Sequence, residues 1–509
     1  MNGVGAGGRP RWRVPAGVFL VGGVAMVNLA GAGLAFAKDL AFAAYFGTTR
    51  EADLVNTAYL LPETIGYNLI AAVVSVAAVP ALSRLWAQGR YPEFASTARR
   101  LAVHAAVALA AVAFALWAGG EAVFRMLGQG AGGGSDYPAW VVLYRLLLAA
   151  LPVFPIFAAY AAALAAGGSF FAAAAAPLLL NAMMLAAVIG CVLLHIDRSM
   201  GAVIYAGAIL AGVIAMAGML RLRHARLMVN AAASHPDRSS TERGGASSGT
   251  QPIGRDSASH DRQHPPFEAA ASATAPLPEQ ALAAPAMVRS DGLRAVYAGI
   301  APLLALTLCM QAGYAFERAV AANLAPGTVT ALGYAYRVAQ FPNWVFVAAV
   351  AMVLLPSMSR KAEGDRLRGE AGERARAEVL RALAGTLAVL LPAAALLFAL
   401  RGFTVELLFG RGAFGAESVR MTADLLGGYS LGVVGQAVSA IGLRYFLAIG
   451  RLRACVAVYA AATLVTMAFD LLLVPHYGAP ALGYGSSAGW TLNALLMGWL
   501  LMRSARPYA

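Results

Sequence analysis

Charged residues are scarce in this 509-residue sequence, where Asp, Glu, Lys and Arg make up only 12% of the chain. Soluble domains carry roughly 25%, and the deficit here is concentrated in long apolar stretches. Many of these stretches exceed the roughly 20 residues that a helix needs to cross a bilayer. They are continuous, which excludes an outer-membrane barrel with its alternating segments. Because backbone groups in lipid must be satisfied within their own segment, we predict an all-α polytopic membrane protein.

Cysteine is also rare, and the motifs of nucleotide hydrolysis and zinc proteolysis are missing. Cys191, Cys309 and Cys455 lie far apart inside apolar runs, which excludes a disulfide framework and a cysteine metal motif. The sequence contains neither GxxxxGK[ST] nor HExxH, so ATP hydrolysis and zinc proteolysis are not expected. We expect a transporter without a cofactor, and no enzyme.

Twelve apolar stretches of spanning length are present. They lie near 15–37, 57–82, 100–119, 139–165, 170–194, 200–221, 294–323, 330–357, 379–400, 422–448, 453–474 and 480–502. Arginine and lysine gather before the first stretch and after every second one. By the positive-inside rule, this alternation places both termini and the central loop on the cytoplasmic side of the membrane. The net charge of +13 then marks cytoplasmic loops, and nucleic acid is not an expected partner.

The chain divides into two six-helix lobes with a polar segment between them. We expect lobes at 1–221 and 293–509 and a disordered cytoplasmic linker at 222–292, because most of that segment is polar and lacks periodicity. The lobes repeat: Gly33-x-x-Phe36-x-Lys38 recurs as Gly313-x-x-Phe316-x-Arg318. Six spans in each half make the repeat parallel, with a pseudo-two-fold axis along the membrane normal.

Several ionisable residues stand out within or at the ends of the predicted spans. They are Lys38, Asp39, Glu317, Arg318, Arg337 and Asp470, with Arg145 and Arg444 as further candidates nearer the span ends. Each should face a cavity or a partner, since a charge at bilayer depth costs several kcal/mol. Lys38 and Asp39 could instead reach the interface, and Asp470 could be a structural acid.

Arg337 is the most informative of these residues. Apolar and aromatic side chains flank it in GYAYRVAQFP, so its charge is not explained by an exposed loop. Arginine is well suited to bidentate contacts with phosphate. A buried arginine in a cavity therefore indicates an anionic, phosphate-bearing substrate.

Several stretches are similar to a known transporter family. GLAFAKDLAFAAYFGTTREADLVNTAYLLP (33–62), APLLLNAMM (176–184) and LAPGTVTALGYAYRVAQFPNWVFVAAVAMVLLPSMSR (324–360) carry the resemblance in the first eight spans. LLFGRGAFGAESVRMTADLLGGYSLG (407–432) and YGAPALGYGSSAGWTLNALL (477–496) carry it in the rest. The chain resembles the MurJ/MviN lipid II flippase family of the MOP exporter superfamily, which also contains the MATE transporters.

This resemblance implies two lobes around a basic cavity that takes the pyrophosphate and sugar head of lipid II. The substrate-binding candidates that it implies, with Arg318 added for its place in the seventh span, are Arg337, Lys38, Asp39, Asp53 and Arg318. It also implies a coupling site for Na⁺ or H⁺ in the second lobe, formed by Glu317, Thr466, Asp470 and Ser486. Oxygen ligands of this kind suit hard cations.

The sequence also departs from the family pattern. Ala32 and Gly66 stand where well-studied members have cavity arginines, and two further C-terminal helices of many members have no counterpart here. We therefore keep three hypotheses. The first is a lipid II flippase driven by an ion gradient or by membrane potential. The second is an exporter of another polyprenyl-linked glycan, such as an exopolysaccharide or teichoic acid precursor. The third is a degenerate scaffold that recruits cell-wall synthesis proteins.

Overall fold

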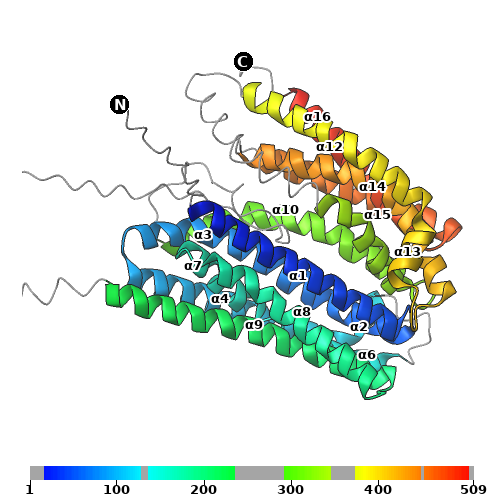
Figure 1. Ribbon diagram of the computed structural model, residues 1–509, viewed down its shortest axis with the longest axis horizontal. Helices are drawn as coiled ribbons and strands as arrows, with labels where there is room; N and C mark the ends of the chain where they lie inside the picture. Colours follow the sequence, from blue (N-terminus) through cyan, green and yellow to red (C-terminus); the bar gives the residue numbers. More distant parts are fainter. Residues whose placement is uncertain (1–15, 128–135, 235–291, 345–372, 449–451, 504–509) are drawn as a thin grey trace, which may run out of the picture.

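The computed structural model describes residues 16–127, 136–234, 292–344, 373–448 and 452–503, and every regular element within these ranges is a helix (Figure 1). The first lobe contains α1 (Ala16–Phe46), α2 (Arg50–Leu61), the π-helix η1 (Pro62–Ala71), α3 (Ala72–Ala87), α4 (Tyr91–Ala118), α5 (Gly120–Met126), α6 (Tyr137–Leu148), α7 (Phe154–Ala166), α8 (Phe170–Leu193) and α9 (Arg198–Ser234). The second contains α10 (Gly292–Ala321), a helix at 328–344, α12 (Glu373–Ala399), α13 (Arg401–Phe409), α14 (Ala416–Ala448), α15 (Leu452–Tyr477) and α16 (Pro480–Arg503).

The helices occupy all twelve expected spans. Eight helices among the described residues are long and apolar enough to cross a membrane, and the expected fourth span is divided between the shorter α6 and α7. Part of the expected eighth span, 345–357, lies outside the described residues. The chain is thus an all-α polytopic membrane protein with two six-helix lobes, as the sequence predicts.

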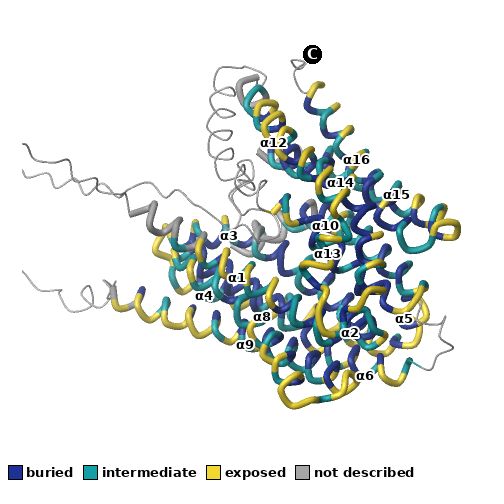
Figure 2. Tube along the Cα trace, turned by 45° about the vertical axis from the view of Figure 1, so that its right-hand side comes forward, coloured by how far each residue is buried: buried dark blue, intermediate teal, exposed yellow. Residues whose placement is uncertain are grey.

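Each lobe is held together by close helix packing. In the first lobe α8 packs against α1 and α9, and α3 packs against α7. In the second, α16 packs against α14 and α15. Glycine permits the α14–α16 contact, since a Cβ on Gly428 would lie 2.7 Å from the backbone of Gly483. Small residues serve this purpose in lipid, where close backbone approach replaces a hydrophobic driving force. Figure 2 shows the buried residues following these packed faces.

The first span is longer than expected, and this changes the position of Lys38 and Asp39. We predicted that they end the span at 15–37, but α1 continues to Phe46. The extra residues are apolar and buried, including Phe42 and Phe46. Lys38 and Asp39 therefore lie inside the helix and are only 8% exposed each.

The sixth span also extends beyond its predicted end. α9 continues to Ser234, so residues 222–234, expected in the disordered linker, are helical. Burial explains the extension: His224 is 7% exposed and packs its ring against Phe94 and Tyr160, at centroid distances of 5.9 and 5.1 Å. The rest of the linker up to residue 291 lies outside the described residues.

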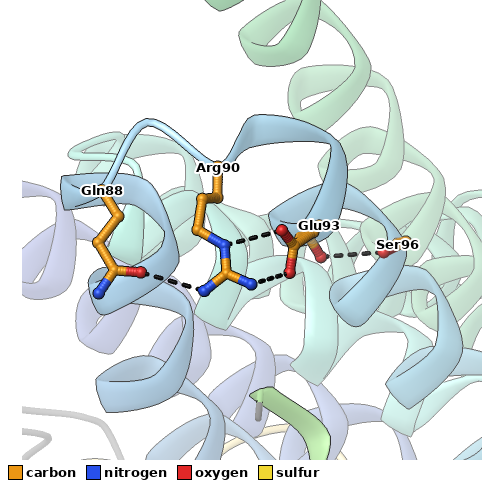
Figure 3. Close-up of polar contacts among 4 residues, drawn as sticks. All are labelled: Gln88, Arg90, Glu93 and Ser96. Carbon is orange, nitrogen blue, oxygen red and sulfur yellow. Dashed lines mark hydrogen bonds and ion pairs between the residues drawn. The ribbon is translucent and has the colours of Figure 1, made fainter.

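The turn between α3 and α4 is fixed by a surface ion pair near the same aromatic cluster. Arg90 donates to both carboxylate oxygens of Glu93 and to Gln88, and Ser96 donates to the carbonyl of Glu93 (Figure 3). An exposed pair of this kind contributes about 0.2–1 kcal/mol. It therefore orients the start of α4 and adds little to stability.

The two lobes meet at one end of the molecule and diverge toward the other, where α1 begins and α16 ends (Figure 1). We call the meeting point of residues 44–49, 324–330 and 410–418 the closed end. Three glycines there have positive φ: Gly47 (+65°), Gly327 (+90°) and Gly412 (+61°). A side chain on any of them would strike the backbone of another segment of the closed end. Glycine is therefore required here both for conformation and for space.

Hydrogen bonds between the lobes complete the closed end. The backbone N–H of Ala413 donates to the carbonyl of Ala44 at 2.8 Å, and the hydroxyls of Thr48 and Ser418 are 2.7 Å apart. Asp53 makes the largest contribution. Its carboxylate accepts from the backbone N–H of Gly327 at 2.6 Å, and from the N–H and hydroxyl of Thr330 at 2.9 and 2.6 Å. An acid from α2 thus caps the helix at 328–344, where the helix dipole favours negative charge.

Replacing Asp53 by Ala should open the closed end. Hydrogen bonds to a charged group contribute about 1.5–3 kcal/mol, so losing several should shift the conformational equilibrium by at least about tenfold. A Thr48→Cys reporter should then react several-fold faster with a membrane-impermeant maleimide in the Asp53→Ala background than in the parent. The same two proteins without the Thr48→Cys substitution are the controls for labelling of the native cysteines. Equal rates would show that Asp53 does not hold this end shut.

Candidate functional site

A charged cluster joins the two lobes at bilayer depth. Asp39 on α1 forms an ion pair with Arg337 on the 328–344 helix, and its Oδ1 lies 2.8 Å from Lys38 Nζ. The side chains of Lys38 and Asp39 are 10% and 11% exposed, whereas that of Arg337 is 40% exposed. Arg337 therefore has surface available for a ligand. Two cations share one carboxylate here, which leaves a net positive charge.

Arg318 is a third cation on the same side of the second lobe. It is 7% exposed, and its guanidinium carbon lies 3.4 Å from the centroid of the Tyr314 ring and 6.0 Å from that of Tyr336. Stacking on aromatic faces is a favourable environment for guanidinium. One of its nitrogens, Nη1, has no hydrogen-bond partner among the described residues. Arg318 Nη1 is thus a hydrogen-bond donor next to the rings of Tyr314 and Tyr336.

Two sequence positions lie elsewhere than the resemblance suggested. In this conformation Asp53 belongs to the closed end, where it accepts from Gly327 and Thr330, and it forms no ion pair with Arg337 or Lys38. Gly66 faces the interior of the first lobe, where a Cβ would lie 3.0 Å from Leu151 Cδ1 and close to the ring of Phe154. A side chain at position 66 has no space here. In this conformation, position 66 therefore does not correspond to a place for an arginine in the space between the lobes.

Our sequence reasoning missed Glu63. This acid lies inside the expected span 57–82, on the π-helix η1, and it is partly exposed. It interacts electrostatically with Arg337 and with Tyr314, both from the second lobe. Glu63 therefore lies near charged and aromatic residues of the second lobe. The signal was available, because Glu63 is an intramembrane acid directly after Pro62 and should have been treated like Glu317.

A second polar cluster lies inside the second lobe. Glu317 on α10 is 2% exposed, and its Oε1 accepts from the Tyr429 hydroxyl at 2.7 Å and from the Ser486 hydroxyl at 2.8 Å. The adjacent Arg318 points to the tyrosines instead, as expected for neighbours about 100° apart on a helix. Glu317 thus ties α10 to α14 and α16.

Asp470 on α15 is close to this cluster and unsatisfied. It is fully buried, and neither carboxylate oxygen has a hydrogen-bond partner in the described part of the chain. It interacts electrostatically with Glu317, and Gly485, next to Ser486, packs directly against its Oδ1. Thr466, one turn earlier on α15, packs against Gly489 of α16. The four residues named from the sequence are therefore gathered where α10, α15 and α16 meet.

This donor set suits a cation or a proton. A buried carboxylate without partners is costly, and a hard cation with oxygen ligands, or protonation, would relieve that cost. The described residues contain no group of three or more His, Cys, Asp and Glu side chains that could hold a metal ion. The oxygen atoms gathered here are two carboxylates and two hydroxyls, from Glu317, Asp470, Thr466 and Ser486.

Comparison with known proteins finds sequence similarity over part of the chain. The family model described as lipid II flippase MurJ matches residues 272–508. A probable lipid II flippase MurJ of Rhizobium meliloti (strain 1021) is 33% identical over 177 residues, which are 35% of this chain and 32% of the relative. The lipid II flippase MurJ of Burkholderia cenocepacia is 29% identical over 210 residues, or 41% and 40% of the two chains. The matched part is thus less than half of either relative.

Solved structures share the fold over nearly the whole length. A lipid II flippase MurJ in an inward closed conformation superposes with a TM-score of 0.66 at 15% identity, covering 96% of this chain and 90% of that one. A MATE family transporter in an inward-facing conformation gives 0.67 at 14% identity, covering 94% and 98%. The second half of the chain thus matches the MurJ family model in sequence, and nearly the whole chain has a fold that it shares with a MurJ flippase and with a MATE transporter.

Proposed function

We propose that this protein is a flippase, and not an enzyme, that carries an undecaprenyl-linked peptidoglycan precursor, lipid II, across the bacterial inner membrane. The observation that carries the proposal is the cluster of Arg337, Asp39 and Lys38 between the lobes. Its net positive charge at bilayer depth suits a pyrophosphate, and the partly exposed Arg337 can make bidentate contacts with phosphate oxygens. The named relatives are lipid II flippases, which supports this substrate.

Alternating access follows from this arrangement. Asp39 and Lys38 belong to the first lobe and Arg337 to the second, so a bound pyrophosphate bridges both lobes. A ligand shifts a conformational equilibrium only through different affinities for the two states. The pyrophosphate binds best when Arg337 and Lys38 both reach it. For this, the ion pair between Arg337 and Asp39 must break. Binding therefore favours the state in which the lobes approach around the head group, and release favours their separation.

The orientation in the membrane belongs to the same proposal. With both termini in the cytoplasm, as the loop arginines predict, the closed end faces outward and the diverging end faces inward. The lipid-linked glycan then enters from the cytoplasmic side, where it is made. Membrane lipid surrounds the apolar outer faces.

We further propose that the cluster of Glu317, Thr466, Asp470 and Ser486 holds Na⁺ or H⁺ and couples transport to an ion gradient. The unpartnered oxygens of Asp470 support a cationic occupant. The bound cation would compensate the negative charges of Glu317 and Asp470. Without it, the bilayer interior opposes the ionisation of these two acids. Glu317 would transmit its occupancy to α10, whose next residue is Arg318.

A second candidate function is export of another polyprenyl-linked glycan. The observation that favours it is the smaller number of cavity cations, since Ala32 and Gly66 stand at positions of family arginines. A pyrophosphate would still bind Arg337 and Lys38 in this case, so the two candidates differ in the sugar and not in the mechanism. A third, a scaffold for cell-wall synthesis proteins, would need none of these charged contacts.

Complementation tests the proposed function. The chain should restore growth to a bacterium depleted of its own lipid II flippase. Arg337→Ala should fail because the guanidinium that receives the pyrophosphate is gone. Arg337→Lys should restore growth poorly, since lysine keeps the charge but loses the bidentate geometry.

The matched control for that experiment is Arg420→Ala. Arg420 is an exposed arginine of α14 that pairs with Glu417 at the closed end, and its loss should leave growth unchanged. Failure of the wild type, with protein present in the membrane, would favour the second candidate. Equal rescue by wild type and Arg337→Ala would refute the assigned site.

Ion coupling can be tested separately. In vesicles, wild-type flipping of a lipid-linked glycan should respond to an imposed Na⁺ or pH gradient, and which of the two acts identifies the ion. Asp470→Asn should reduce this response about tenfold or more, because the amide cannot supply the charge that binds a cation. Asp424→Asn, an exposed acid of α14, is the control. An unchanged gradient response in Asp470→Asn would exclude this cluster as the coupling site.

A further inference from the structure

Tyr336 lies directly before Arg337 on the same helix, and its ring meets aromatic rings from three other helices of the second lobe. Its centroid lies 5.8 Å from that of Tyr314 on α10 and 5.8 Å from that of Tyr429 on α14, with interplanar angles of 69° and 77°. The ring of Trp490 on α16 follows at 6.1 Å. Edge-to-face arrangements of this kind are favourable. One ring therefore packs its helix against α10, α14 and α16 together.

Glu317 joins the same three helices through hydrogen bonds. It belongs to α10, and its Oε1 accepts from Tyr429 of α14 at 2.7 Å and from Ser486 of α16 at 2.8 Å. Tyr429 takes part in both sets of contacts, because its hydroxyl donates to Glu317 while its ring contacts Tyr336 and stacks on Trp490 at 5.8 Å. Tyr429 is fully buried. A change in its position must therefore be accommodated by the rings around it.

The residue after Tyr336 connects the helix to the first lobe. Adjacent residues of an α-helix point about 100° apart, so Tyr336 and Arg337 face different neighbours. Asn343, about two turns after Tyr336, lies on the same face as Tyr336 and donates to Gln436 of α14 at 2.6 Å. Arg337 instead forms the ion pair with Asp39 of α1. One face of this helix is thus held on α14, and another presents Arg337 to the first lobe.

The charge of Glu317 determines how firmly the junction of the three helices is held. Hydrogen bonds to an ionised acceptor are roughly twice as strong as neutral ones. Compensation of this charge, by a bound cation or by substitution, therefore weakens the bond that ties Tyr429 to α10. Close-packed interiors transmit such a change, and Tyr336 is in direct ring contact with Tyr429.

We propose that Tyr336 is a positioning residue that transmits the state of Glu317 to Arg337 through Tyr429, and so sets the affinity of Arg337 for the pyrophosphate. This assignment rests on the proposed function, because it takes a pyrophosphate as the ligand of Arg337. Tyr336 acts through its ring contacts, and neither the lipid nor a cation needs to touch it.

A double-mutant cycle tests the role of Tyr336, with the full-length protein in lipid nanodiscs and its affinity for undecaprenyl pyrophosphate as the readout. Glu317→Gln should weaken binding about fivefold in the otherwise wild-type protein, a size usual for residues that share partners. In the Tyr336→Leu background it should change the affinity by less than about twofold, because the transmitting ring is gone. The direct electrostatic effect of removing the charge is present in both backgrounds and cancels in the cycle.

Two tyrosine-to-phenylalanine changes form a matched pair for this experiment, because each removes one hydroxyl and keeps the ring. Tyr429→Phe should abolish the effect of Glu317→Gln, since the hydroxyl that joins Glu317 to the rings is lost. Tyr336→Phe is the control and should preserve that effect, since its ring remains. The pair also decides the question if Tyr336→Leu does not fold.

Persistence of the Glu317→Gln effect in Tyr336→Leu or in Tyr429→Phe would overturn the proposal and indicate a route through α10 and Arg318 instead. Loss of the effect in Tyr336→Phe would refute transmission through the ring. An affinity that Glu317→Gln leaves unchanged in the wild type would also overturn the proposal, while the pyrophosphate site would stand if Arg337→Ala still weakens binding. If the wild type does not bind undecaprenyl pyrophosphate, the proposed function itself is wrong, and the role of Tyr336 is refuted with it.

Discussion

An ionised side chain in a bilayer has no water to stabilise it, so it must find its counter-charge within the protein. This constraint determines how the two lobes meet. Asp39 neutralises only one of two neighbouring cations, and the remaining charge is the feature that a pyrophosphate can exploit. The same constraint gives meaning to the acids without partners. Asp470 is such an acid, because both of its carboxylate oxygens are buried inside the second lobe without a hydrogen-bond partner among the described residues.

The helix at 328–344 connects the closed end to the charged cluster. Its N-terminus is capped by Asp53 of the first lobe, and Arg337 lies nine residues further, about 14 Å along the axis. Both contacts with the first lobe are therefore made through one rigid element. A ligand that draws Arg337 away from Asp39 acts on the same helix whose end Asp53 holds. Loss of either contact should change the energy of the other, and this coupling is what alternating access needs.

Much of this architecture could be predicted from the sequence, because hydropathy and loop charge report directly on spans and their number. Helix geometry alone also predicts that Glu317 and Arg318 do not pair with each other, because adjacent residues point about 100° apart. Three features could not be predicted this way. The extension of α1 past Asp39 and of α9 to Ser234 depends on tertiary burial of Phe42 and His224. The π-helix from Pro62 to Ala71, in which Gly66 lies against Phe154, is not revealed by any periodicity of apolar residues.

The position of α10 explains how an ion inside one lobe can influence a ligand between the two. α10 packs against α15 in its own lobe and against α3 and η1 of the other. Glu317 faces α14 and α16 through Tyr429 and Ser486, while the next residue, Arg318, stacks on the tyrosines of the space between the lobes. A shift or rotation of α10 therefore moves both side chains at once. Since α14 and α16 are locked together by glycine contacts, a change at Glu317 is more easily accommodated by α10 than by its neighbours. Under the proposed function, occupancy of the cation site thus changes the position of Arg318 and of the face of α10 that packs against η1.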